Sequence, residues 1–286
     1  MATLYTIAHY KSGFILKSAY IFEFLIGLVV YVVSMLVLNL ITQKNDLTQK
    51  STHTVLLFSF LTTLIPSSLE SVDVLLSNLF ILIALRSILD LKIEKNIKSK
   101  VFNASLCISI ASLIYFWSIG FMILVFVGVF LFESKDYRNW IIPFIGFATI
   151  YLFMNCYQLA INDTFFSITE YIAPVSFSFD DYLNNKQLFT VGTIMICTVF
   201  FFSIYLFKFK RNSAKIKPIL NLIIGQLLIA IAFVCIVPNK NTAELYFIAS
   251  PLAIIGTTYL ELEYNELVKE VNIWVFLLLP FMILLF

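Results

Sequence analysis

The chain has 286 residues, of which 60% are hydrophobic and only 13% are charged, and its mean hydropathy is +0.95. These values lie far outside the composition of water-soluble domains and exclude a soluble fold. The formal net charge of +2 is too small to indicate nucleic-acid binding, and the basic residues gather in short loops between apolar runs. The composition therefore predicts a polytopic membrane protein whose loop charges orient its segments.

The N-terminal part of the chain contains apolar runs of different lengths. Residues 1–18 mix basic and apolar side chains, which favours a segment lying in the membrane interface, with a frayed tail as the alternative. Residues 19–41 are long enough, at about 1.5 Å per residue, to cross a hydrocarbon core of roughly 30 Å. The run 55–65 is short and stops at Pro66, so it either crosses or re-enters the same face. Residues 74–89 form the next predicted span.

The run 101–132 is too long for one untilted helix and short for two. The aromatic residues Tyr115, Phe116 and Trp117 at its midpoint are typical of an interface, so we predict two short helices with a turn there. A single helix would force the basic loop 208–217 outside the cell, against the positive-inside rule. With two helices, this loop and the lysine-rich loop 91–100 both lie in the cytoplasm.

Further spans are predicted at residues 140–160, 188–207, 218–237, 245–260 and 271–286. Between the first two of these, the aromatic and acidic segment 161–187 is expected to form an external loop that lies on the outer interface. Only helices satisfy the backbone in lipid when runs are this long and apolar. We therefore predict an all-α, polytopic transmembrane helical bundle of about nine or ten membrane segments, one of them short and a candidate re-entrant segment, within a single integral membrane domain 1–286.

Three motifs within residues 75–146, ALRSI, FNASL and ESKDYRNWIIPFIG, carry a family resemblance. The order of the three motifs, and the basic loop that follows the first of them, resemble an uncharacterised family of multi-pass inner-membrane proteins from Bacteroidota. This family is known as a domain of unknown function. The resemblance implies a location in the bacterial inner (cytoplasmic) membrane. It implies no reaction.

No soluble-type catalytic motif or metal site is visible. His9 and His53 are far apart in the sequence and belong to no HxxH pattern, and there is no Walker A loop, GxGxxG or GxSxG. The cysteines all lie in apolar runs without a CxxC pair, so we expect inert, buried thiols. No metal and no cofactor is predicted.

A set of polar residues converges on the outer face in this topology. Glu70 and Asp73 precede a span, and Lys240 and Glu244 precede another. One carboxylate of the first pair could act as a base or metal ligand toward a lipid-linked substrate, and Lys240, Glu244 and Arg86 could bind substrate or a lipid headgroup. The plainer interpretation is solvated loop charges, with Arg86 snorkelling to the headgroups.

The order of these features loosely resembles the glycosyltransferase C superfamily, in which an acid in the first external loop sits over a many-helix bundle. Here the acids follow the second apolar run, and no paired-acid signature is present. Asn78, one turn beyond Asp73, joins the same outer set.

Two classes of function follow. The first is a non-enzymatic subunit or scaffold of a membrane-embedded complex, with membrane lipids and a membrane protein as partners, because few ionisable residues lie deep in the spans. The second is an enzyme acting on a lipid-linked substrate at the outer face, with Glu70 or Asp73 as its catalytic acid. We predict the first.

Overall fold

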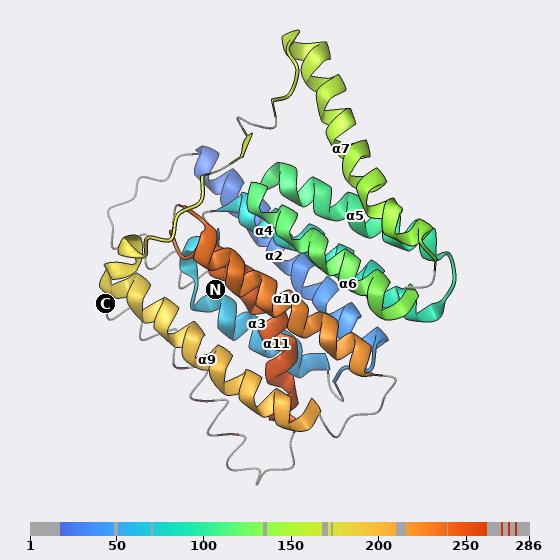
Figure 1. The fold of residues 1–286 in the computed structure, drawn as a ribbon. Helices are drawn as coiled ribbons and strands as arrows, with labels where there is room; N and C mark the ends of the chain where they lie inside the picture. The colour runs from blue at the N-terminus through green and yellow to red at the C-terminus, as the bar shows by residue number, and fades with distance from the viewer. Residues whose placement is uncertain are drawn as a thin grey trace. The chain divides into compact units, whose positions relative to one another are not determined.

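The computed structural model describes residues 18–48, 51–69, 71–133, 136–167, 171–172, 174–209, 216–238 and 240–261, and single residues at 270, 274 and 278. In this part of the chain there are nine α-helices, joined in places by 3₁₀ turns, and no strand (Figure 1). Eight helices are long and apolar enough to cross a membrane, and the shorter α3 (Ser51–Thr63) is apolar too. The predicted all-helical polytopic architecture is confirmed.

The chain separates into two compact units by the contacts among its residues. Unit 1 comprises Met1–Leu75, Phe177–Ser213 and Asn239–Phe286, and unit 2 comprises Leu76–Ser176 and Ala214–Pro238. The boundary between Leu75 and Leu76 falls near the start of α4 (Val72–Leu89). The expectation of one integral domain over residues 1–286 stays a prediction.

Unit 1 is built around its last described helix. Among its described residues, the α-helices are α2 (Ser18–Lys44), α3, α9 (Asn185–Phe209) and α11 (Tyr246–Leu260). α11 packs against both α3 and α9. At Gly256 a side chain would have its Cβ 3.1 Å from Leu57 of α3 and from Phe201 of α9, so the glycine permits a close approach of the helices. The ring of Tyr246 meets Phe58 edge-on at 5.8 Å.

Unit 2 is built around a closely packed helix pair. Besides most of α4, its described α-helices are α5 (Ile97–Ile114), α6 (Met122–Glu133), α7 (Arg138–Asn162) and α10 (Lys217–Ile236). Among the described helices, α5 and α7 make the most extensive contact. A Cβ at Gly146 of α7 would lie only 1.9 Å from Ser105 Oγ on α5. The absence of a side chain at Gly146 therefore lets the two backbones approach.

The predicted break near Tyr115 is confirmed. α5 ends at Ile114, Tyr115 has extended backbone, and the 3₁₀ helix η3 (Phe116–Phe121) leads into α6. Backbone carbonyls at the end of α5 accept hydrogen bonds from side chains: Ala111 O from Ser77 Oγ at 3.3 Å, and Ser112 O from Tyr171 at 3.1 Å. Ala111 O also accepts the Tyr115 N–H at 2.8 Å, whereas the bond from Tyr171 satisfies a carbonyl that the end of the helix leaves open.

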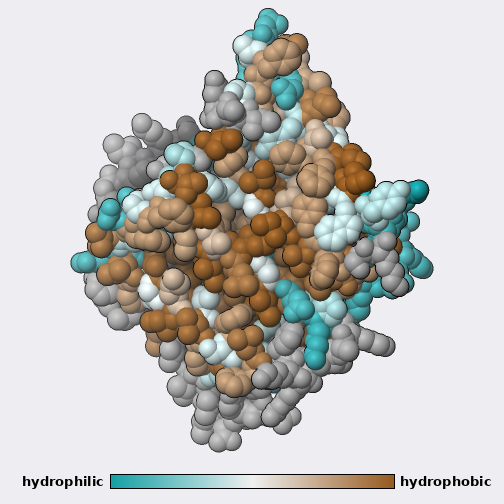
Figure 2. Space-filling model, in the orientation of Figure 1, coloured by the Kyte–Doolittle hydropathy of each residue, from teal (hydrophilic) through white to brown (hydrophobic). Residues whose placement is uncertain are grey.

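Apolar side chains are exposed on the outward faces of many helices, and brown surface covers much of the view in Figure 2. This is the surface expected of helices that face lipid tails. The helices differ widely in burial: 94% of the most apolar window of the span ending in α11 is buried, against 11% for α7.

Several predicted features lie outside the described residues. These are the interfacial segment up to residue 17, Glu70, the centre of the basic loop at 210–215, and nearly all of the last apolar run, 271–286. The segment predicted to form an external loop at 161–187 overlaps the neighbouring helices at both ends, because α7 extends to Asn162 and α9 begins at Asn185.

Candidate functional site

Lys240 and Glu244 are brought together with residues of the segment before α9 in a buried polar cluster of unit 1. Only 2% of Lys240 and 1% of Glu244 is exposed. The hydroxyl of Tyr182, in the 3₁₀ helix η4 (Asp180–Leu183), donates a hydrogen bond to Glu244 Oε1. For Lys240 and Glu244, the interpretation as solvated loop charges is wrong, because the chain folds over both side chains.

The backbone before α11 is held in an uncommon conformation. Thr242 has φ of 70°, in the left-handed region that β-branched residues rarely adopt, and it precedes the 3₁₀ helix η5 (Ala243–Leu245). Its N–H donates to Glu244 Oε1 at 3.2 Å. Its hydroxyl is 2.6 Å from Ser67 Oγ in the 3₁₀ helix η1 (Pro66–Leu69). Contacts on both sides of Thr242 therefore stabilise the strained turn.

Lys240 is anchored to the segment before α9 by two contacts. Its ammonium nitrogen lies 4.7 Å from the centre of the Phe179 ring, a cation–π geometry. Its backbone N–H donates to Asp181 Oδ2 at 3.3 Å. Together with the Tyr182 hydrogen bond, these contacts join residues 179–182 to residues 240–244.

The cluster is closed in its present arrangement. Tyr182 is 5% exposed and Thr242 is 4% exposed, so a substrate would have to displace chain segments to reach the Glu244 carboxyl. The second carboxyl oxygen, Oε2, has no hydrogen-bond partner among the described residues. These polar contacts are suited to holding the segment before α9 against the start of α11.

Sequence reasoning identified Lys240 and Glu244 but missed Tyr182, Thr242 and Ser67. The Tyr182–Glu244 bond joins positions 62 residues apart, and no local spacing encodes such a contact. All of the residues 177–181, which precede Tyr182, are exposed, whereas Tyr182 itself is buried. The sequence around Tyr182 therefore has no pattern of buried apolar residues that would mark this tyrosine as buried.

The other predicted site residues do not join the cluster. Asp73 and Arg86 are exposed in the first and last turns of α4, and neither makes a hydrogen bond or ion pair with another described residue. Asn78 is fully buried in unit 2. The expectation of buried thiols is wrong for Cys156, which is exposed on α7, whereas Cys197 is buried.

These helices define a multi-pass integral membrane protein with a closed polar cluster in one unit. The chain belongs to the family of unknown function DUF6427, whose model matches residues 5–286. The predicted membership of a domain of unknown function is thereby confirmed over nearly the whole chain. No curated protein and no solved structure matches it.

Proposed function

We propose that this chain is a non-enzymatic subunit or scaffold of a membrane-embedded complex in the inner membrane of a Bacteroidota bacterium. The observation that carries the proposal is the second half of α7. The location rests on the three sequence motifs described above and on the excess of basic residues in the loops assigned to the cytoplasm.

The second half of α7 extends beyond its partner helix. Tyr151 is 3.2 Å from Ser112 Oγ, close to the end of α5 at Ile114, and α7 continues to Asn162. Figure 1 shows this half of α7 running away from α5 and α6. Five of its exposed side chains are large and apolar: Leu152, Phe153, Tyr157, Leu159 and Ile161.

Gln158 interrupts this apolar surface. Its side chain is only half-buried and has no hydrogen-bond partner among the described residues. Lipid tails can cover the apolar side chains but cannot satisfy an amide, whereas a neighbouring transmembrane helix can supply a hydrogen bond. The combination therefore favours a membrane protein as the partner of this half of α7.

The proposal can be tested by cross-linking in membranes. Phe153 is 70% exposed in the second half of α7, and Phe144, in the first half, is 64% exposed. A photoreactive phenylalanine at position 153 should give a discrete cross-link to another protein, and the same group at 144 should react with lipid alone. Equal cross-linking at both positions, or cross-links only between copies of this chain, would contradict the proposal.

The alternative is an enzyme that acts on a lipid-linked substrate at the outer face, as in the glycosyltransferase C superfamily. The observation that favours it is the exposed carboxylate of Asp73 at the start of α4. In that case Asp73→Ala and Glu70→Ala should abolish a membrane-glycan phenotype without affecting expression. Glu261→Ala and Glu270→Ala are matched acidic controls, and wild-type behaviour of all the variants would leave the scaffold proposal standing.

A further inference from the structure

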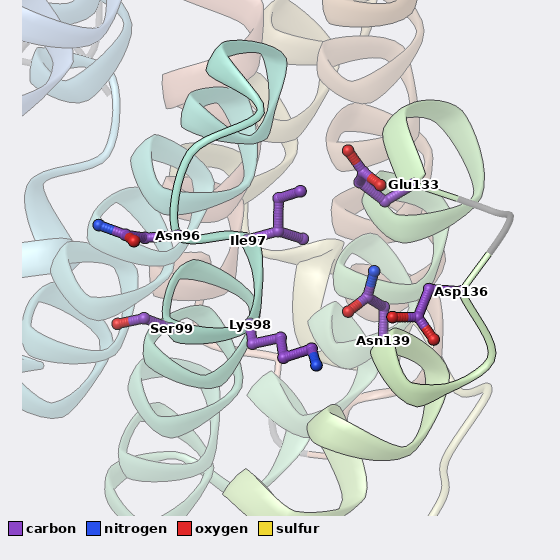
Figure 3. Close-up of a pocket in the computed structure, with 7 residues that line it drawn as sticks. All are labelled: Asn96, Ile97, Lys98, Ser99, Glu133, Asp136 and Asn139. Atoms are coloured by element: carbon purple, nitrogen blue, oxygen red, sulfur yellow. The ribbon is translucent and has the colours of Figure 1, made fainter.

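A pocket of about 470 Å³ lies in unit 2, where α5 begins and α6 is followed by α7 (Figure 3). Its volume is within the range of small-molecule sites, roughly 300–1,000 Å³. Lys98 lines one side, and Glu133, Asp136 and Asn139 line another. In Figure 3 the Lys98 side chain extends from α5 toward Asn139 and Asp136.

The α5 side of the pocket is suited to an anion. Asn96 precedes the helix with φ of 53° and makes no side-chain capping hydrogen bond, and the first turn contains no acidic residue. The N–H groups at a helix start need acceptors and favour negative charge. Lys98 adds a positive charge at the same end, so an anion held here would meet both the ammonium and the helix N-terminus.

The opposite side of the pocket is suited to a cation with hydrogen-bond donors. Asn139 is 2% exposed, and its Oδ1 has no hydrogen-bond partner among the described residues. The carboxylates of Glu133 and Asp136 are half-buried beside it, and one oxygen of Asp136 accepts the Arg138 N–H at 3.0 Å. Within the described chain, Lys98 forms no ion pair with either carboxylate.

We propose that this pocket binds a phosphate ester that carries a primary ammonium group, the chemistry of a phosphatidylethanolamine headgroup. The phosphate lies against Lys98 and the first turn of α5. The ammonium has three N–H donors, which match acceptors on Glu133, Asp136 and Asn139. A choline headgroup has the same phosphate but no N–H donor, and a glycerol headgroup has no positive charge.

The position of the pocket fits this ligand. It lies at the ends of helices long and apolar enough to span the membrane, beside the lysine-rich loop assigned to the cytoplasm. Lipid headgroups are present at this level of the membrane. The inference is independent of the proposed partner of α7, because it involves the other end of that helix.

The test uses the purified full chain in detergent, titrated with dioleoyl phosphatidylethanolamine, phosphatidylcholine and phosphatidylglycerol, with binding followed by native mass spectrometry. We expect phosphatidylethanolamine to bind roughly tenfold or more tightly than either of the others, the effect of one or more charge-assisted hydrogen bonds. Free phosphoethanolamine forms a further arm: binding as tight as that of the lipid would support the same chemistry and identify a soluble source.

Variants separate the two sides of the pocket. Lys98→Gln should weaken binding of every phosphate-containing ligand, whereas Glu133→Gln should remove the preference for ethanolamine over glycerol. Lys95→Gln and Glu94→Gln are controls, because both residues are exposed in the same loop and neither lines the pocket. Equal binding of the three lipids, or equal effects of Lys98→Gln and Lys95→Gln, would overturn the proposal.

Discussion

The Tyr182 hydroxyl donates a hydrogen bond to the buried carboxyl of Glu244 and so joins the segment before α9 to the start of α11. The same carboxyl oxygen accepts the Thr242 N–H, which supports the left-handed turn at that residue. One acidic side chain therefore stabilises both a distant contact and a strained local conformation. Glu244 therefore has a structural role in the interior of unit 1.

We predict that Tyr182→Phe lowers the free energy of unfolding by about 1–3 kcal/mol, because it leaves a buried oxygen of Glu244 with one fewer donor. Unfolding of the purified protein in mixed micelles would measure the change. Tyr137→Phe is the control, since Tyr137 is 69% exposed and should change stability little. A loss no larger than that of the control would show that the Tyr182 bond adds nothing to stability.

We predict that Gly146→Ala destabilises unit 2 by about 1–3 kcal/mol, because the new Cβ would overlap Ser105 and force α7 away from α5. Gly192→Ala in α9 is the matched control: a Cβ there meets nothing within 4 Å, and alanine is the better helix former. The measurement is the melting temperature of each variant, which should fall for Gly146→Ala and change little for Gly192→Ala. If both variants melt like the wild type, the close approach of α5 and α7 is wrong.

We predict that Asn96 and Asp163 lie on opposite sides of the membrane. Asn96 is in the lysine-rich loop, and Asp163 follows the end of α7. In a cysteine-free background, a membrane-impermeant maleimide should label Asp163→Cys in cells with a permeabilised outer membrane, and Asn96→Cys only after the inner membrane is opened. The reverse pattern would invert the topology and place the polar pocket on the outer side.

We predict that Gln158→Leu leaves the chain folded but weakens the cross-link from position 153 to a partner protein. The glutamine is on the apolar second half of α7 and has no hydrogen-bond partner within the described residues. Hydrogen bonds of this kind between membrane helices contribute about 0.6–2 kcal/mol. Thr149→Val, on the same helix, is a control, because the Thr149 hydroxyl is already bonded to Ile145 O. An undiminished cross-link in Gln158→Leu would exclude the amide from the interface.

The helices could be predicted from the sequence because apolar length alone selects them. The break at Tyr115 followed from run length and interfacial aromatics, and the structure places it between α5 and η3. The α5–α7 contact at Gly146 could not be predicted, because a glycine in an apolar run does not reveal which helix it faces. Only part of the closed cluster could be predicted. Lys240 and Glu244 stand out in the sequence as charged residues, whereas Tyr182 resembles the other aromatic residues of its segment.

The last prediction concerns Asn78 and its neighbour Ser77. Asn78 is fully buried in α4, and both polar atoms of its amide lack a hydrogen-bond partner among the described residues. Ser77 is equally buried, but its hydroxyl bonds to Ser118 Oγ at 2.5 Å and to Ala111 O at 3.3 Å. The adjacent residues therefore differ in hydrogen bonding rather than in burial.

We expect substitutions at these two positions to change the free energy of unfolding in opposite directions. Asn78→Leu keeps the number and branching of the side-chain heavy atoms and removes an unsatisfied amide, so the free energy of unfolding should rise by about 1 kcal/mol. Ser77→Ala should lower it by about 0.5–1.5 kcal/mol, because Ser118 and the end of α5 lose a partner. Both values come from the same unfolding measurement in mixed micelles. If Asn78→Leu is as destabilising as Ser77→Ala, the prediction that the unsatisfied amide of Asn78 costs stability is wrong.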